Sequence, residues 1–401
     1  MVEVRTQPAA PDLRPQTEAG PKLRVVMASR RELTVTGTSR YVSSLLPELT
    51  RLGVDVHLMH PAMPLPLPGG WPLRQAGIDI SRFFAHYPLH MMRQDVDLYH
   101  LASQNLATLL MTQRFDRPVV VTVHDIIPYL TDKSGDRNNS RHSSPYRHSL
   151  HRWFDHLAMK GLGRADILLA DSEWTRRTLI ESLGLSEQRI HVAPLGIDLI
   201  RFRPGPPSPA FRATYGLPAG NRYILYVGSE DPRKNLEHLI CAVAIVRRSF
   251  RDVQLLKVGP AHHDAEHRWL EVLVQLLGVA DAVRWFDHVP EADLPGFYQA
   301  ASVFVMPSAY EGFGLPVLEA LACGTRVVCS DASALPEVAG ADTIVCTPTP
   351  AELACGIQTC LKESNDRGEA ARVAWARSFT WASTATKTTA AYKLAGAVKR
   401  S

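Results

Sequence analysis

Residues 307–319 read PSAYEGFGLPVLE and join a predicted strand to a predicted helix. The strand is the apolar run SVFVM at residues 302–306, which precedes the stretch. Pro316 suits the first position of a helix, so Glu319 is expected in the first helical turn. A strand, a short glycine-containing loop and a helix in this order are typical of a parallel α/β sheet.

Two carboxylates, Glu311 and Glu319, lie eight residues apart around this helix start. Backbone N–H groups at a helix start favour a phosphate or a sugar oxygen. An ionised carboxylate only accepts hydrogen bonds and therefore suits hydroxyl groups. The combination favours a ligand with both phosphates and hydroxyls, such as a nucleotide-sugar. For Glu319 a second interpretation stays open, in which it only complements the helix dipole.

A second loop supplies the cations that such a ligand needs. Residues 223–229, YILYVGS, predict a buried strand, and Arg233 and Lys234 follow it before a helix expected at 236–250. Ligands bind at the carboxyl ends of parallel strands, where Arg offers a planar fork and Lys a point charge to phosphate. Cations are mildly unfavourable at a helix start, which favours a functional pair over a solvated one. Gly228 lets the backbone approach a ligand closely.

Five segments together carry a resemblance to a known family. They are VTVHD at 121–125, APLGID at 193–198, VGSEDPRKNL at 227–236, EGFGLPVLEALACGTRVVCSD at 311–331 and FTWASTATKTTAAY at 379–392. In their order and spacing the chain resembles the retaining glycosyltransferases of the GT4 family, which have the GT-B fold. The resemblance implies a nucleotide-sugar donor bound mainly by the C-terminal half.

The resemblance also implies roles for matching positions. Arg233 and Lys234 would hold the diphosphate, Glu311 and the Phe313 and Gly314 amides would hold the sugar, and Glu319 would take the ribose hydroxyls. The expected catalytic residues are thus Arg233, Lys234, Glu311 and His124, and the expected donor-binding residues are Gly228, Ser229, Phe313, Gly314, Leu315 and Glu319. His124 is expected near the transferred sugar or the acceptor, and a loop histidine that caps backbone is the alternative.

The N-terminal half offers two further cleft contacts, Gly37 and Asp125. The stretch Gly37-Thr38-Ser39-Arg40 matches a loop that approaches the diphosphate in relatives, with one glycine where two are common. Arg40 either substitutes as a charged contact or lies on solvated surface. Asp125 is expected to orient loop backbone.

Strand and helix patterns alternate along all 401 residues, which predicts an α/β chain of two Rossmann-like doubly wound domains facing across a cleft. The breaker cluster PGPPSP at 204–209 marks their boundary. The predicted parts are a disordered arm at 1–22, an acceptor-binding domain at 23–203, a nucleotide-sugar-binding domain at 204–378 and a C-terminal helix at 379–401. From the resemblance, this helix is expected to cross back onto the first domain.

Composition indicates a globular protein in the cytoplasm. The net charge of +4 is too small to indicate nucleic acid binding. The sequence contains no run of eighteen apolar residues, so no membrane span is expected. The N-terminus lacks the apolar core of a secretory signal. Residues 141–160, RHSSPYRHSLHRWFDHLAMK, predict an amphipathic helix with Leu150, Trp153, Phe154 and Leu157 on one side. It either packs on the sheet or makes a peripheral contact with the inner face of the membrane.

No metal cofactor is expected. Asp95-Val96-Asp97 resembles a metal motif but begins a predicted strand, at the edge opposite the ligand. The spacing of His262, His263 and His267 could hold a metal ion on one helix face, but an exposed helix start is the favoured interpretation. Arg233, Lys234 and a helix end are expected to neutralise the leaving diphosphate instead.

The predicted reaction is transfer of a hexose, with retention, from a nucleoside-diphosphate sugar to an acceptor hydroxyl of a glycan, polysaccharide or glycolipid. The segments VHDIIPYL and PRKNL resemble mannosyltransferases that use GDP-mannose, and a UDP-sugar is the alternative donor. Two other classes stay open: a nucleotide-sugar epimerase or sugar phosphorylase on this fold, and a non-catalytic nucleotide-sugar-binding module.

Overall fold

The computed structural model describes residues 22–30, 37–60, 83, 86–127, 129–130, 149–261, 264–362 and 368–398. Of the arm expected at 1–22, residues 1–21 lie outside the described residues, and so do His262 and His263.

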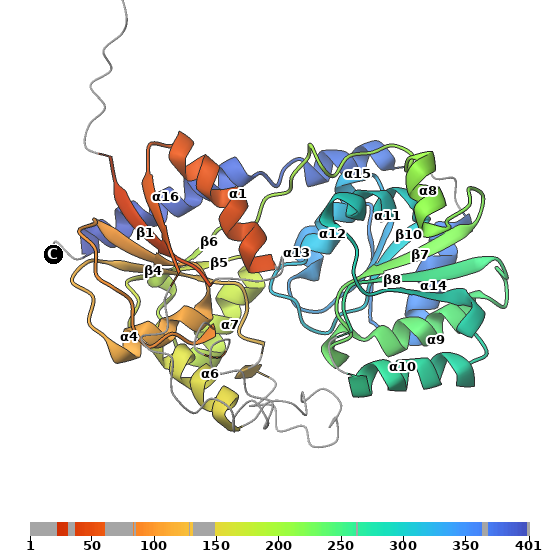
Figure 1. Ribbon diagram of the computed structural model, residues 1–401, viewed down its shortest axis with the longest axis horizontal. Coiled ribbons are helices and arrows are strands. Elements are labelled where there is room, and N and C mark those ends of the chain that lie inside the picture. The colour runs from red at the N-terminus through yellow and green to blue at the C-terminus, as the bar shows by residue number, and fades with distance from the viewer. Residues whose placement is uncertain are drawn as a thin grey trace, which may run out of the picture.

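The first part of the chain forms a parallel six-stranded sheet in the order β2-β1-β3-β4-β5-β6 (Figure 1). Its strands are β1 (Arg24–Ala28), β2 (Asp55–Met59), β3 (Leu98–Leu101), β4 (Val119–Val123), β5 (Ile167–Ala170) and β6 (Ile190–Val192). The helices that accompany them are α1 (Gly37–Arg51), η1 (Gln104–Thr108), α4 (Leu109–Thr112), α6 (Ser149–Leu162), α7 (Glu173–Leu183) and η3 (Glu187–Arg189). The strands β3, β4 and β5 are buried throughout, as expected for short apolar runs covered on both faces. We call this part the N-terminal lobe.

The second part repeats this plan in a parallel sheet of order β12-β11-β10-β7-β8-β9. Its strands are β7 (Arg222–Val227), β8 (Val253–Val258), β9 (Val283–Phe286), β10 (Val303–Met306), β11 (Val327–Ser330) and β12 (Ile344–Cys346). Its helices are α8 (Pro209–Tyr215), η4 (Pro232–Lys234), α9 (Leu236–Val246), α10 (Asp264–Leu276), η5 (Ala280–Ala282), η6 (Glu291–Asp293), α11 (Leu294–Ala300), α12 (Leu315–Ala322), α13 (Leu335–Ala339), α14 (Pro350–Lys362) and α15 (Glu369–Ala376). We call this part the C-terminal lobe.

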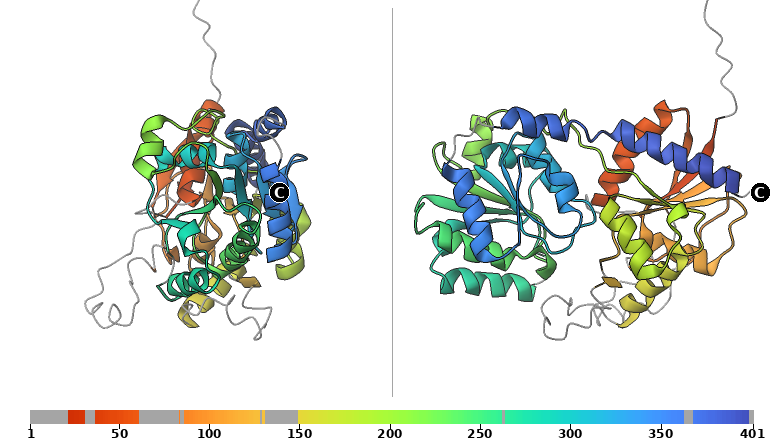
Figure 2. Two further views of the ribbon diagram at one scale, coloured as in Figure 1. Left: turned by 90° about the vertical axis from the view of Figure 1, so that its right-hand side faces the viewer. Right: turned by 180° about the vertical axis from the view of Figure 1, so that it is seen from behind.

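The last helix, α16 (Trp381–Val398), returns to the N-terminal lobe and packs on α1 and on the sheet (Figure 2). The Tyr392 hydroxyl lies 2.7 Å from His100 Nδ1 in the buried interior of that lobe. The predicted GT-B architecture, with its returning helix, is therefore confirmed. The predicted start of this helix at residue 379 is two residues early, because α16 begins at Trp381.

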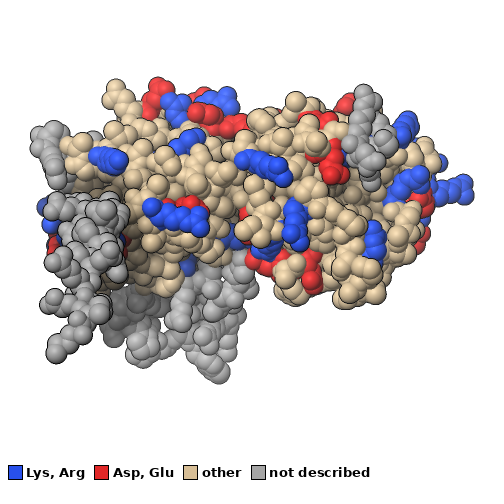
Figure 3. Space-filling model, turned by 90° about the horizontal axis from the view of Figure 1, so that it is seen from above, with Lys and Arg blue, Asp and Glu red and all other residues tan. Residues whose placement is uncertain are grey.

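The predicted single apolar side of α6 is also wrong. Phe154 is buried against Phe83 and Tyr87, and Leu157 packs on the same cluster. Trp153 is instead 57% exposed. In the described part of the chain no helix is long and apolar enough to cross a membrane. The face seen in Figure 3 shows basic and acidic side chains interspersed.

Candidate functional site

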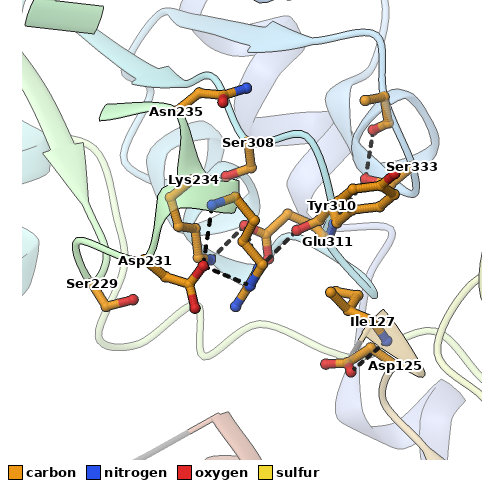
Figure 4. A network of polar contacts seen from close by, with 12 residues as sticks. Asp125, Ile127, Ser229, Asp231, Lys234, Asn235, Ser308, Tyr310, Glu311 and Ser333 are labelled. Carbon is orange, nitrogen blue, oxygen red and sulfur yellow. Dashed lines mark hydrogen bonds and ion pairs between the residues drawn. The ribbon is translucent and has the colours of Figure 1, made fainter. Parts of the chain in front are cut away.

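The predicted cations and Glu311 meet after β7 and β10. Lys234 Nζ lies 2.5 Å from Glu311 Oε1, and Arg233 Nη1 lies 3.8 Å from the same oxygen. Arg233 also donates to the Tyr310 carbonyl at 2.8 Å. Figure 4 shows Lys234 and Glu311 pointing toward one another. Two loops 77 residues apart in sequence thus form one charged cluster.

Local hydrogen bonds hold the basic loop in place. The Asp231 side chain caps η4 by accepting from the Arg233 N–H at 3.1 Å. Asn235 follows in the left-handed region, with φ of 52°, and turns the chain into α9. Its Nδ2 donates to the Pro307 carbonyl at 2.9 Å, which ties η4 to the loop after β10. The position of both cations is therefore built into the C-terminal lobe.

The charges in this cluster stabilise each other. Burial alone would raise the pKa of Glu311, but Lys234 and Arg233 outweigh it and hold the pKa below its ordinary value. Burial lowers the pKa of Lys234, and Glu311 opposes that change. An ammonium carries three donors and Glu311 occupies one, so Lys234 keeps donors for an anionic ligand.

The remaining predicted donor-binding residues lie on the same loops. Gly228 N donates to the Val258 carbonyl at 2.8 Å, and the Ser229 carbonyl accepts from the Tyr226 hydroxyl at 2.6 Å. Phe313, Gly314 and Leu315 lead directly from Glu311 into α12. Gly314 caps α12 with a φ of 112°, a conformation that favours glycine.

Glu319 does not lie where the sequence predicted. Because α12 begins at Leu315, Glu319 is its fifth residue and falls outside the first turn, so the helix-dipole interpretation is wrong. The side chain is buried. Its Oε1 accepts from Arg40 Nη1 at 2.6 Å and its Oε2 from the Tyr298 hydroxyl at 2.7 Å. Burial raises the pKa of Glu319 above its ordinary value, although Arg40 opposes the rise.

Arg40 therefore pairs with carboxylates and does not lie on solvated surface, and its predicted contact with a diphosphate stays a prediction. Its Nε donates to Glu291 Oε1 at 2.6 Å, and Arg201 Nη1 donates to Glu291 Oε2 at 3.0 Å. These side chains form a row of alternating charge that runs between the lobes. Gly37, the other predicted contact of this loop, is the exposed first residue of α1.

His124 lies next to the Glu311 loop with both ring nitrogens engaged. Nδ1 lies 2.7 Å from Asp171 Oδ2 and Nε2 lies 3.0 Å from the Ala102 carbonyl. The Ala102 carbonyl can only accept, so Nε2 is a donor, and Nδ1 shares a proton with the Asp171 carboxyl group. Burial would lower the pKa of His124, but Asp171 outweighs it and raises the pKa. Asp171, which directly follows β5, was not among the residues predicted from the sequence. Asp125 accepts from the Ile127 N–H at 3.2 Å, the predicted backbone role.

The Gly312 carbonyl joins this loop to the N-terminal lobe. It accepts from the Ser172 hydroxyl at 2.8 Å and from the Thr175 hydroxyl at 3.2 Å, both at the start of α7. The Glu337 carboxylate accepts from the first two backbone N–H groups of α7, those of Glu173 and Trp174, at 2.8 and 2.7 Å. A Cβ on Gly312 would lie 1.7 Å from the His124 carbonyl oxygen. Only glycine permits this approach of the lobes.

The described side chains considered above as possible metal ligands form ion pairs with other residues. Asp95 and Asp97 pair with Arg24 at 3.1 and 3.5 Å. His267 Nδ1 lies 3.0 Å from Glu230, which is itself paired with the buried Lys257. Among the described residues, no group of His, Cys, Asp and Glu side chains is arranged to hold a metal ion.

Comparisons with known proteins agree with this geometry. The profile for glycosyl transferases group 1 matches residues 208–374, and that for glycosyltransferase family 4 matches residues 35–201. The chain is 32% identical to the O-antigen chain mannosyltransferase B of Escherichia coli over 71% of its own length and 72% of that protein. It is 32% identical to the MMP alpha-(1->4)-mannosyltransferase of Mycolicibacterium hassiacum over 76% and 72% of the two lengths.

A solved structure shows the same fold across nearly the whole chain. The crystal structure of Anabaena HepE in complex with UDP-glucose matches with a TM-score of 0.67 and 19% identity. The match covers 94% of this chain and 100% of that protein.

Proposed function

The chain belongs to the GT4 family of glycosyltransferases with the GT-B fold, and from this premise we propose that it transfers a hexose from a nucleoside-diphosphate sugar. The acceptor is a hydroxyl group of a saccharide or a lipid-linked saccharide, and the anomeric configuration is retained. Mannose is the favoured sugar and GDP-mannose the favoured donor. This is supported by the two mannosyltransferase relatives.

The proposal rests on one observation, the convergence of Arg233 and Lys234 on Glu311. Negative charge gathers on the diphosphate as the glycosidic bond breaks, and preorganised cations in a water-poor site stabilise it strongly. Hydrogen bonds of the loop that carries Arg233 and Lys234 hold both cations in position. We assign the Glu311 carboxylate beside them to accept sugar hydroxyls. We thus assign stabilisation of the negative charge on the leaving group to these side chains and the start of α12, without a metal ion.

Retention follows from attack on the face that the diphosphate leaves, with a departing phosphate oxygen accepting the proton of the acceptor hydroxyl. His124 is assigned to hold the loop that faces this reaction. Both of its ring nitrogens are engaged by Asp171 and Ala102, so neither is directed at the acceptor hydroxyl in this arrangement.

A donor screen tests the proposal. Thermal shifts are measured with GDP-, UDP- and ADP-sugars, followed by GDP release from GDP-mannose with octyl α-mannoside or water as acceptor. GDP-mannose is expected to give the largest shift. Stabilisation by none of the sugars would contradict the proposal.

Lys234→Ala is expected to lower turnover about 100- to 1000-fold, the usual cost of one preorganised donor to a developing charge. Lys393→Ala, an exposed lysine on α16, is the matched control and is expected to leave turnover unchanged. Near-normal turnover of a folded Lys234→Ala variant would remove the phosphate role.

A further inference from the structure

Arg40 and Glu319 form a contact between the lobes that the proposed chemistry does not use. They lie 279 residues apart in sequence, Arg40 on α1 and Glu319 on α12. The Arg40 side chain is 28% exposed, whereas that of Glu319 is 3% exposed. A buried carboxylate is costly unless it is paired with a cation and hydrogen-bonded. Its partner here is a residue of the opposite lobe.

Few other groups offset the charge of Glu319. Its charged and titratable neighbours are Arg40 from α1, Tyr298 from α11, Glu291 from η6, Arg201 from the segment after β6, and Cys323 after α12. Glu291 repels it, Tyr298 donates one neutral hydrogen bond, and Arg201 is engaged by Glu291. Arg40 alone among the described cations makes a direct ion pair with Glu319.

The pair borders an open cavity of about 380 Å³ between the lobes. Ser39, Leu315 and Arg201 are also among its walls. A carboxylate offers about four acceptor sites, and Arg40 and Tyr298 occupy two of those on Glu319. The others are available to a vicinal diol in the cavity. Leu315, at the start of α12, connects the cavity to the Glu311 loop.

We propose that Arg40 is a positioning residue for the donor, which keeps the Glu319 carboxylate charged from across the cleft so that it accepts the two ribose hydroxyls of the nucleoside diphosphate. This inference rests on the proposed function. It makes binding of the nucleoside depend on the approach of the lobes, because Arg40 reaches Glu319 only when α1 and α12 are side by side.

The test is the pH dependence of GDP and UDP binding, measured by calorimetry from pH 5.5 to 8.5. Hydroxyl binding needs ionised Glu319, so affinity falls as pH falls through its pKa. Loss of a cation at contact distance raises a carboxyl pKa by about 1 to 3 pH units. In Arg40→Met the fall is therefore expected at a pH higher by about this amount, with affinity near the wild-type value at the top of the range. Arg40→Lys is expected to restore most of the wild-type profile.

Two further variants keep the test decisive. Arg247→Met removes an arginine paired with Asp281 at 2.6 and 2.8 Å on another face, and is expected to bind as wild type does. Arg40→Met/Glu319→Gln removes both charges, so it is expected to fold even if Arg40→Met does not, and to bind weakly without this pH dependence.

The outcomes separate the inference from the proposed function. An unchanged profile in Arg40→Met, or a loss of equal size at every pH, would overturn the inference and leave the donor site intact. A double variant that keeps the pH-dependent fall would also overturn it. Failure of the wild-type protein to bind any nucleotide would overturn the proposed function as well.

Discussion

The two glutamates of the C-terminal lobe, Glu311 and Glu319, are both buried and both paired with cations, but the cations come from different places. Lys234 and Arg233 reach Glu311 from the same lobe. Arg40 reaches Glu319 from the opposite lobe. The pKa of Glu311 is held below its ordinary value, whereas burial leaves that of Glu319 above it. In the proposed donor site, the diphosphate and sugar end is therefore assigned to one lobe, and the nucleoside end depends on a residue of the other.

Among the variants that test this difference, Gly312→Ala is expected to have the largest effect. The new Cβ would lie 1.7 Å from the His124 carbonyl oxygen, so the lobes must separate. Misplacement of reacting groups by about 1 Å can cost 100-fold in rate, and we expect turnover to fall by about that factor. Nucleotide affinity is expected to weaken by no more than about tenfold, since the groups proposed to bind the nucleotide lie on the C-terminal lobe and only the pairing of Arg40 with Glu319 is lost.

The control for this variant is Gly396→Ala on α16, where a Cβ meets no atom within 4 Å. It is expected to have wild-type turnover. Wild-type turnover in Gly312→Ala as well would show that the approach of the lobes at this point does not matter.

Glu319→Gln isolates the nucleoside end. We expect GDP and UDP to bind about tenfold more weakly, the scale of one hydrogen bond to a charged group. The 2′,3′-dideoxy nucleotides, which lack both hydroxyls, are expected to bind the variant and the wild type equally. Calorimetry gives the affinity of each nucleotide for both proteins. An equal loss for the dideoxy nucleotides would contradict the ribose role of Glu319.

Tyr298→Phe tests a smaller part of the same end. It removes the hydroxyl that donates to Glu319, and we expect a loss of about 1 to 3 kcal/mol in the free energy of unfolding. Tyr223→Phe is the matched control, because this buried tyrosine donates to the neutral Pro218 carbonyl at 3.1 Å. Its expected loss is about 1 kcal/mol. Denaturant unfolding that finds no difference would argue against an ionised Glu319.

The sequence predicted the features that depend on local pattern. Apolar runs predicted most strands. Glycines and charged residues after β7 and β10 predicted that Arg233, Lys234 and Glu311 lie at one edge of the sheet. The position of Glu319 was missed by less than one turn, because proline suits the second helical position as it does the first.

Contacts between the lobes could not be predicted in this way. The ion pair of Arg40 with Glu319 and the approach of Gly312 to His124 depend on how two separately folded sheets are placed. Local pattern carries no information on that placement. The same holds for Asp171, whose pairing with His124 required the register of β4 and β5.

The most direct test of the account is a crystal structure of the protein with bound GDP. The account predicts the diphosphate oxygens within hydrogen-bond distance of Arg233 and Lys234, and the ribose hydroxyls on Glu319 beside Arg40. A well-defined nucleotide bound away from these side chains would contradict it.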